Sequence, residues 1–110
     1  PAPRATLAQV ADHVDHIKRV AGVDHVGLGG DFDGISEVVQ GLEDVSTYPA
    51  LLAELSRRGW SEGDLRKLAG ENALRVMRQA EAVSARLRRE RAPSTATIEG
   101  LDGGRGAGGR

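Results

Sequence analysis

The feature that most constrains this chain is a single strand-like stretch, residues 25–34, in which glycines and two acids follow a short apolar run. His25 to Leu28 has the length and character of a buried strand. Glycines at positions 27, 29, 30 and 34 surround Asp31 and Asp33. Spacing alone favours the simpler interpretation, in which both acids only form a turn. An acid just after a parallel strand, however, points into the cleft where α/β proteins place catalytic groups. We therefore expect the functional edge of the chain here.

Three glycine-containing ligand motifs are excluded at this stretch. Residues 27–32 lack the last glycine of a dinucleotide-binding fingerprint, and residues 29–34 are followed by Ile35 and Ser36 instead of the Lys and Ser or Thr of a phosphate loop. In residues 31–34 the glycine comes two places too early for a calcium-binding EF loop.

Composition excludes several classes of partner. The 110 residues suffice for one small domain, and the net charge of −1 gives no reason to expect a nucleic acid partner. Aromatic residues make up only 3 % of the chain, too few for a base-stacking surface. Cysteine is absent, so disulfides and cysteine-based zinc sites are excluded within this chain. Neither a signal peptide nor an apolar run of membrane-spanning length is visible.

The rest of the chain has helical patterns. A helix is predicted over residues 6–21, where Thr6 and Gln9 form a capping box and Leu7, Val10, Val14 and Ile17 form one apolar stripe. Further helices are predicted over residues 48–58, after a cap at Ser61, and from a cap at Asn72 onward. We expect residues 1–91 to form the folded segment and residues 92–110, rich in Pro, Ser, Thr and Gly, to be a disordered tail.

One strand among about four helices is an incomplete arrangement. A lone buried strand leaves its backbone N–H and C=O groups unpaired, at a cost of about 1–3 kcal/mol each. The missing neighbouring strands could come from other copies of the chain or from upstream sequence. We favour upstream sequence, and the lack of an initiating Met fits a piece of a longer protein. The predicted fold class is α/β, mostly helical as an isolated chain.

The histidines invite a metal-site hypothesis. His13 and His16 share a helix face at a spacing that can chelate a metal. The neighbouring Val14 and Ile17 belong to the buried stripe, however, and no third ligand is placed to complete a site, so a structural or surface role is favoured. His25 lies at the start of the strand, the wrong end for an active site.

Five blocks together resemble the C-terminal part of the renal (membrane) dipeptidases, the binuclear zinc dipeptidases of peptidase family M19. The match covers about residues 7–85. The blocks are residues 13–17 (His-Val-Asp-His-Ile), 26–34 (Val-Gly-Leu-Gly-Gly-Asp-Phe-Asp-Gly), 41–49 (Gly-Leu-Glu-Asp-Val-Ser-Thr-Tyr-Pro), 58–61 (Arg-Gly-Trp-Ser) and 72–76 (Asn-Ala-Leu-Arg-Val).

This resemblance implies a (β/α)8 TIM barrel, of which the chain would hold the last strand and its flanking helices. Asp31 matches the family's acid at the end of the eighth strand. That acid contacts the metal-bridging hydroxide and the free amine of the substrate, so Asp31 is the expected catalytic and substrate-binding residue. Asp33 is expected to brace the turn.

The resemblance also marks what this chain lacks. The family's zinc ligands lie upstream, so no metal ligand is assigned here, and the isolated chain is expected to be inactive although the complete enzyme would hold two zinc ions. The family further implies a dipeptide substrate, a homodimer and a lipid anchor on the extracellular face of the membrane. The alternative hypothesis is a non-catalytic helical interaction fragment.

Overall fold

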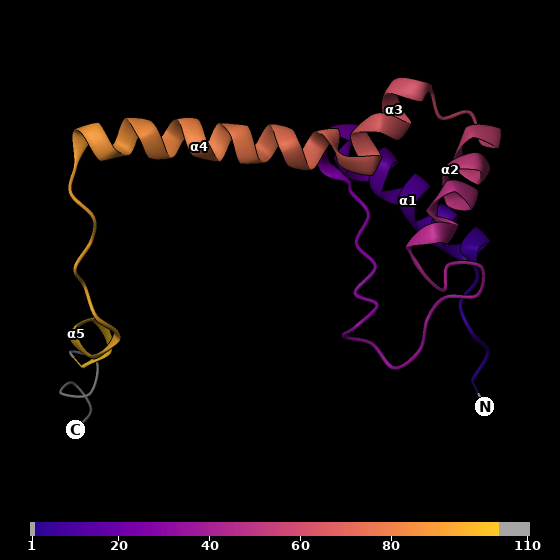
Figure 1. Ribbon diagram of the computed structural model, residues 1–110, viewed down its shortest axis with the longest axis horizontal. Helices are drawn as coiled ribbons and strands as arrows, with labels where there is room; N and C mark the ends of the chain where they lie inside the picture. The colour runs from indigo at the N-terminus through magenta and orange to yellow at the C-terminus, as the bar shows by residue number, and fades with distance from the viewer. Residues whose placement is uncertain (1, 104–110) are drawn as a thin grey trace. The chain divides into compact units, whose positions relative to one another are not determined.

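The computed structural model describes residues 2–103, which are mainly helical (Figure 1). They belong to two compact units, an N-terminal unit of Pro1–Met77 and a C-terminal unit of Arg78–Arg110. The helices, in chain order, are α1 (Leu7–Ala21), η1 (Val23–His25), η2 (Val45–Thr47), α2 (Tyr48–Arg57), α3 (Glu62–Arg66), η3 (Lys67–Glu71), α4 (Asn72–Glu90) and α5 (Ile98–Asp102). The expectation of a mostly helical chain is confirmed.

Helix α1 begins and ends as its sequence predicts. The Thr6 side chain accepts from the backbone N–H of Gln9 at 3.3 Å, and the Gln9 side chain accepts from the backbone N–H of Thr6 at 3.0 Å. These two bonds satisfy N–H groups that lack partners within the helix. Gly22 ends the helix with a φ of 92°, a conformation that favours glycine. The predicted apolar stripe is correct as far as Val14, which is buried, but Ile17 is 40 % exposed.

Helix α2 provides two of the three largest fully buried side chains among the described residues. Leu51 and Leu55 are 1 % and 0 % exposed. Burying a leucine side chain contributes on the order of 1.5–3 kcal/mol. Pro49 lies in the first turn, where its missing N–H costs nothing, and Gly59 follows the helix with a φ of 95°. The two leucines belong to a buried hydrophobic cluster that also contains Ala11, Val14, Val26, Leu42, Trp60 and Leu68.

The predicted strand does not form in this structure. His25 is the last residue of η1, and Val26 is extended, with φ −129° and ψ 142°, but unpaired. Among the described residues the β-type pairings are two isolated bridges, Thr6 with Gln40 and Val39 with Leu42. A strand is defined by hydrogen bonds to a neighbour, and no neighbour lies beside residues 26–28. The described residues therefore contain no strand, and the α/β barrel class stays a prediction for the complete protein.

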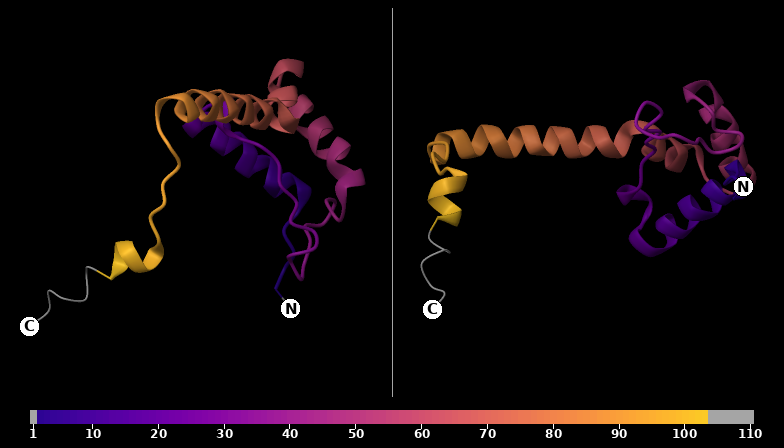
Figure 2. Two further views of the ribbon diagram at one scale, coloured as in Figure 1. Left: turned by 60° about the vertical axis from the view of Figure 1, so that its left-hand side comes forward. Right: turned by 90° about the horizontal axis from the view of Figure 1, so that it is seen from below.

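The loop from residue 26 to residue 44 returns to the beginning of α1. Gln40 donates from its backbone N–H to the Ala5 carbonyl at 2.8 Å and accepts from the Leu7 N–H at 2.9 Å. Arg4 adds a side-chain bond of 2.8 Å to the Val38 carbonyl. The loop and the start of α1 accordingly lie side by side in both views of Figure 2. These bonds hold residues 38–40 of the loop against residues 4–7 at the start of α1.

Helices α3, η3 and α4 are adjacent in the chain, with a kink inside η3 at Gly70, whose φ of 171° and ψ of −22° are not helical. The Ser61 side chain caps α3 by accepting from the Asp64 N–H at 3.1 Å, as predicted. Asn72 was predicted to cap the last helix, and this prediction is wrong: its φ of −62° and ψ of −48° are helical, and its N–H donates to the Lys67 carbonyl. This bond joins residues that are five positions apart in the chain.

The C-terminal unit contains the remainder of α4 and the single-turn helix α5, which Thr97 caps by accepting from the Gly100 N–H at 3.1 Å. Residues 104–110 of the predicted tail lie outside the described residues. Between residues 2 and 103, no helix has both the length and the apolar character needed to cross a membrane.

Candidate functional site

Asp31 occupies the first position of a tight turn at the end of the extended segment. The Gly34 N–H donates to the Asp31 carbonyl at 2.9 Å, which closes the turn. Asp31 has a φ of 48°, in the left-handed region that aspartate tolerates better than most residues. Residues held in this region are frequent at active sites. Its side chain is exposed and lies against Gly34, where an added Cβ would come within 2.9 Å of the Asp31 Cγ.

Asp33 also lies in this turn and is exposed. The structure therefore brings both sequence-predicted acids to one solvent-facing turn. The role of Asp33 as a brace stays a prediction.

The segment before Asp31 is packed against two aromatic rings. Gly30 leaves no room for a larger residue, since an added Cβ would lie 2.7 Å from the Tyr48 hydroxyl and 2.8 Å from a ring carbon of Phe32. The two rings lie at a centroid distance of 6.0 Å and an angle of 41°. Beside them is an apolar cavity of about 120 Å³ lined by Val10, Leu28, Gly29, Gly30, Phe32, Ile35, Val38, Val39, Leu42, Tyr48 and Leu51.

Asn72 anchors the other end of the segment. It is 6 % exposed, and its Nδ2 donates to the carbonyls of Val23 and Val26 at 2.7 and 2.9 Å. Arg75 donates from Nη1 to the Asn72 Oδ1 at 2.8 Å and from Nη2 to the Asp24 carbonyl at 2.6 Å. Sequence reasoning missed this role, because an asparagine after a glycine near a helix start is typical of a cap.

A cluster of charges joins α1 to α2. Arg58 Nη1 lies 2.7 Å from an Asp12 oxygen and 2.9 Å from an Asp15 oxygen, and its Nε lies 3.0 Å from Glu54. Trp60 donates from its indole N–H to Asp15 at 2.6 Å. This bond, and then Arg58, hold the pKa of Asp15 below its ordinary value against the opposing effect of burial.

A second ion pair joins α1 to α3. Lys18 Nζ lies 2.6 Å from Asp64 and 4.3 Å from the centroid of the Trp60 ring. The hydrogen bond from Lys18 is the largest of the effects that hold the pKa of Asp64 below its ordinary value. Both clusters lie far from Asp31 in the sequence and bind helices together, so we interpret them as structural.

The histidines do not assemble into a site. His13 and His16 are exposed on α1, where His16 Nδ1 lies 2.9 Å from Arg19, and His25 is exposed in η1. Within residues 2–103, no three His, Cys, Asp or Glu side chains lie close enough together to hold a metal ion. The described residues therefore do not form a zinc site.

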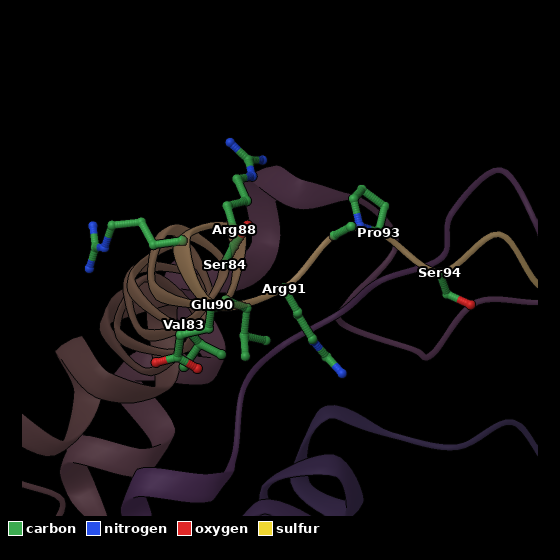
Figure 3. A pocket seen from close by; sticks show the side chains of 11 residues that line it. Val83, Ser84, Arg88, Glu90, Arg91, Pro93 and Ser94 are labelled. Carbon is green, nitrogen blue, oxygen red and sulfur yellow. The ribbon is translucent and has the colours of Figure 1, made fainter.

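An open groove of about 950 Å³ lies within the C-terminal unit, at the end of α4 (Figure 3). It is lined by residues 80, 83, 84 and 87–94, among them Arg88, Glu90 and Arg91. None of its lining residues belongs to the site around Asp31.

Comparisons with known proteins agree on one family. The family model of membrane dipeptidase (peptidase family M19) matches residues 1–91. Dipeptidase 3 of Rattus norvegicus is 54 % identical over 79 residues, which are 72 % of this chain and 16 % of that protein. Dipeptidase 3 of Homo sapiens is 52 % identical over the same shares of the two chains.

A solved structure gives the same result. The crystal structure of dipeptidase AC, a metallopeptidase of family M19, superposes with a TM-score of 0.57 at 41 % sequence identity. The superposition covers 64 % of this chain and 21 % of that one. This chain thus spans about a fifth or less of the length of the relatives it matches.

Proposed function

Because the chain belongs to the membrane dipeptidase family, a family of zinc metallopeptidases, we propose that it forms the C-terminal part of a metallopeptidase that hydrolyses dipeptides. The resemblance seen in the sequence is confirmed by the family match over residues 1–91. That match is the observation that carries the proposal. The activity belongs to the complete protein, since the chain covers 16 % of the length of its curated relatives.

In the proposed complete protein, the extended segment that begins at Val26 is the last strand of a (β/α)8 barrel. Two observations support this. Val26 already has the backbone angles of a strand, and it is buried against the helices that would flank it. A barrel would supply a neighbouring strand on each side and so pair the free N–H and C=O groups of residues 27–30.

Asp31 is the proposed catalytic and substrate-binding residue. A carboxylate at the C-terminal end of a barrel strand lies at the mouth, where TIM-barrel enzymes hold their substrates. Its negative charge suits the ammonium group of a dipeptide. The same carboxylate can accept a proton and pass it to the departing amine when the peptide bond breaks. Its exposure and its left-handed backbone support this assignment.

Zinc is assigned to residues outside this chain. The described residues offer no group of three ligands, so we derive no step of the reaction through a metal held here. Two zinc ions, a homodimer and a lipid-anchored extracellular location remain predictions that follow from the family.

The proposal is tested with Asp31→Asn in the complete protein. General acid–base catalysis contributes about 10²- to 10⁴-fold, so we expect kcat for a dipeptide to fall by that order. Zinc content, measured by atomic absorption, should stay at the parent level because Asp31 is not assigned as a ligand. A variant with the turnover of the parent would remove Asp31 from the mechanism.

The alternative, a non-catalytic helical interaction fragment, makes a different prediction. It draws support from the large apolar side chains exposed on α4, Leu74, Val76, Met77 and Val83, together with the missing ligand set. The reading frame upstream of Pro1 separates the two hypotheses. An open frame that encodes the remaining barrel and its zinc ligands supports the dipeptidase, whereas a start codon directly before Pro1 supports the fragment.

A further inference from the structure

The side chain of Asn72 is almost wholly buried, and both ends of its amide are used. Its Nδ2 spans two carbonyls, of Val23 and Val26, at 2.7 and 2.9 Å, while its Oδ1 accepts from Arg75 at 2.8 Å. A side-chain amide supplies two donors and one acceptor group, which is the set that this position uses. Among the standard side chains only the amides of asparagine and glutamine offer that set, and glutamine is one methylene longer.

The anchored carbonyl of Val26 lies at the base of the segment that carries Asp31. Residues 27–30 between them are three glycines and one leucine, which by themselves have little conformational preference. At its far end the segment is confined by Phe32 and Tyr48 against Gly30. The segment is thus held at two places, and Asn72 supplies the anchor at its N-terminal end.

We propose that Asn72 is a positioning residue for the catalytic carboxylate: it fixes the carbonyls of residues 23 and 26 to α4 and so sets where Asp31 lies. This inference rests on the proposed function, because it acts through Asp31. Displacing a catalytic group by about 1 Å can lower a rate on the order of 10²-fold. The anchor is therefore expected to affect turnover as well as stability.

The test is a double-mutant cycle in the complete protein between Asn72→Asp and Asp31→Asn. Asn72→Asp keeps the shape but replaces both donors with an oxygen that repels the two carbonyls. We expect kcat/KM for a dipeptide, normalised to zinc-loaded protein, to fall about 10- to 100-fold. In the Asp31→Asn background the same substitution should lower kcat/KM less than about 3-fold, because the carboxylate that it displaces is already gone.

Two further variants complete the experiment. Asn72→Ala removes the donors without burying a charge. It replaces Asn72→Asp in the double-mutant cycle with Asp31→Asn if Asn72→Asp fails to fold. Gln79→Glu makes the matched amide-to-carboxylate change at an exposed position of α4 and should leave kcat/KM at the parent level.

The outcomes separate the inference from the proposed function. Suppose that Asp31→Asn impairs turnover. If the Asn72 variants then only lower the melting temperature, Asn72 is merely structural and the inference is wrong. The inference is also wrong if the decreases in kcat/KM caused by the Asn72 and Asp31 substitutions multiply in the double mutant. If Asp31→Asn has the turnover of the parent, the catalytic role of Asp31 is wrong. The positioning role of Asn72 is then wrong as well, because it acts through Asp31.

Discussion

At the scale of single residues, the glycines before Asp31 are not equivalent. A Cβ at Gly30 would overlap with Phe32 and Tyr48, whereas a Cβ at Gly29 would meet nothing within 4 Å. We therefore expect Gly30→Ala to lower the free energy of unfolding by about 1–3 kcal/mol, the usual cost of overpacking, and Gly29→Ala to change it little. Urea unfolding of the 110-residue chain measures the free energy of unfolding of the Gly29→Ala and Gly30→Ala variants. Equal losses in both variants would contradict the packing seen around Gly30.

Asp15 should make stability depend on pH. Its pKa is lowered in the folded state, first by the Trp60 indole N–H and then by Arg58, so its contribution is present above the pKa of the unfolded state. That contribution is lost as the pH falls through the lower, folded pKa. We expect Asp15→Asn to reduce stability at neutral pH and to flatten the acid limb of a melting-temperature profile between about pH 5 and pH 2.

The exposed loop residue Glu37 provides the control for this profile. Glu37→Gln removes one acidic side chain without touching the contacts of Asp15, so it controls for the change in net charge. An Asp15→Asn protein whose profile overlays that of the parent would show that the contacts of Asp15 with Trp60 and Arg58 do not stabilise the fold.

At the scale of elements, the capping box of α1 gives a local prediction. Thr6→Ala removes the acceptor for the Gln9 N–H and should cost about 0.5–2 kcal/mol in unfolding free energy. The exposed Thr95, which lies between α4 and α5, serves as the control, and Thr95→Ala should be neutral. The denaturant midpoints of the two variants, compared at an unchanged m-value, measure both changes in unfolding free energy. An unchanged midpoint for Thr6→Ala would mean that the stability of α1 does not depend on its cap.

The elements also show what the sequence could predict. The bounds of α1 and α2 follow from signals within one turn of each end, such as Thr6, Pro49 and Gly59, and these helices are confirmed. The strand at residues 25–28 was not formed, because pairing depends on neighbours that its own residues do not encode. The role of Asn72 was missed for a similar reason, since its partners lie 46 and 49 positions away in the chain.

For the candidate site, the sequence located Asp31 by a short pattern of glycines and acids. It did not reveal the left-handed backbone of Asp31 or the aromatic rings against Gly30. Those features arise when the loop folds back onto α1 and α2, and such long-range packing has no signature in local spacing.

At the scale of the whole molecule, the isolated chain should be unable to hydrolyse dipeptides. The described residues form no metal site, and Asp31 lies exposed without the groups that would surround it in a barrel. We expect no release of free amino acids from a dipeptide when purified chain is incubated with zinc, and no saturable zinc binding by isothermal titration calorimetry. Turnover by the chain alone would require a ligand set that the described residues do not contain.

We propose that this chain completes a dipeptidase by supplying the last part of its barrel. The most direct measurement is the dipeptide hydrolysis rate of a chimera in which residues 1–91 replace the matching segment of dipeptidase AC. We expect the chimera to load zinc and to hydrolyse dipeptides, and we expect Asp31→Asn to abolish most of that rate while zinc stays bound. A folded, zinc-loaded chimera that is inactive, or one whose rate is unchanged by Asp31→Asn, would contradict it.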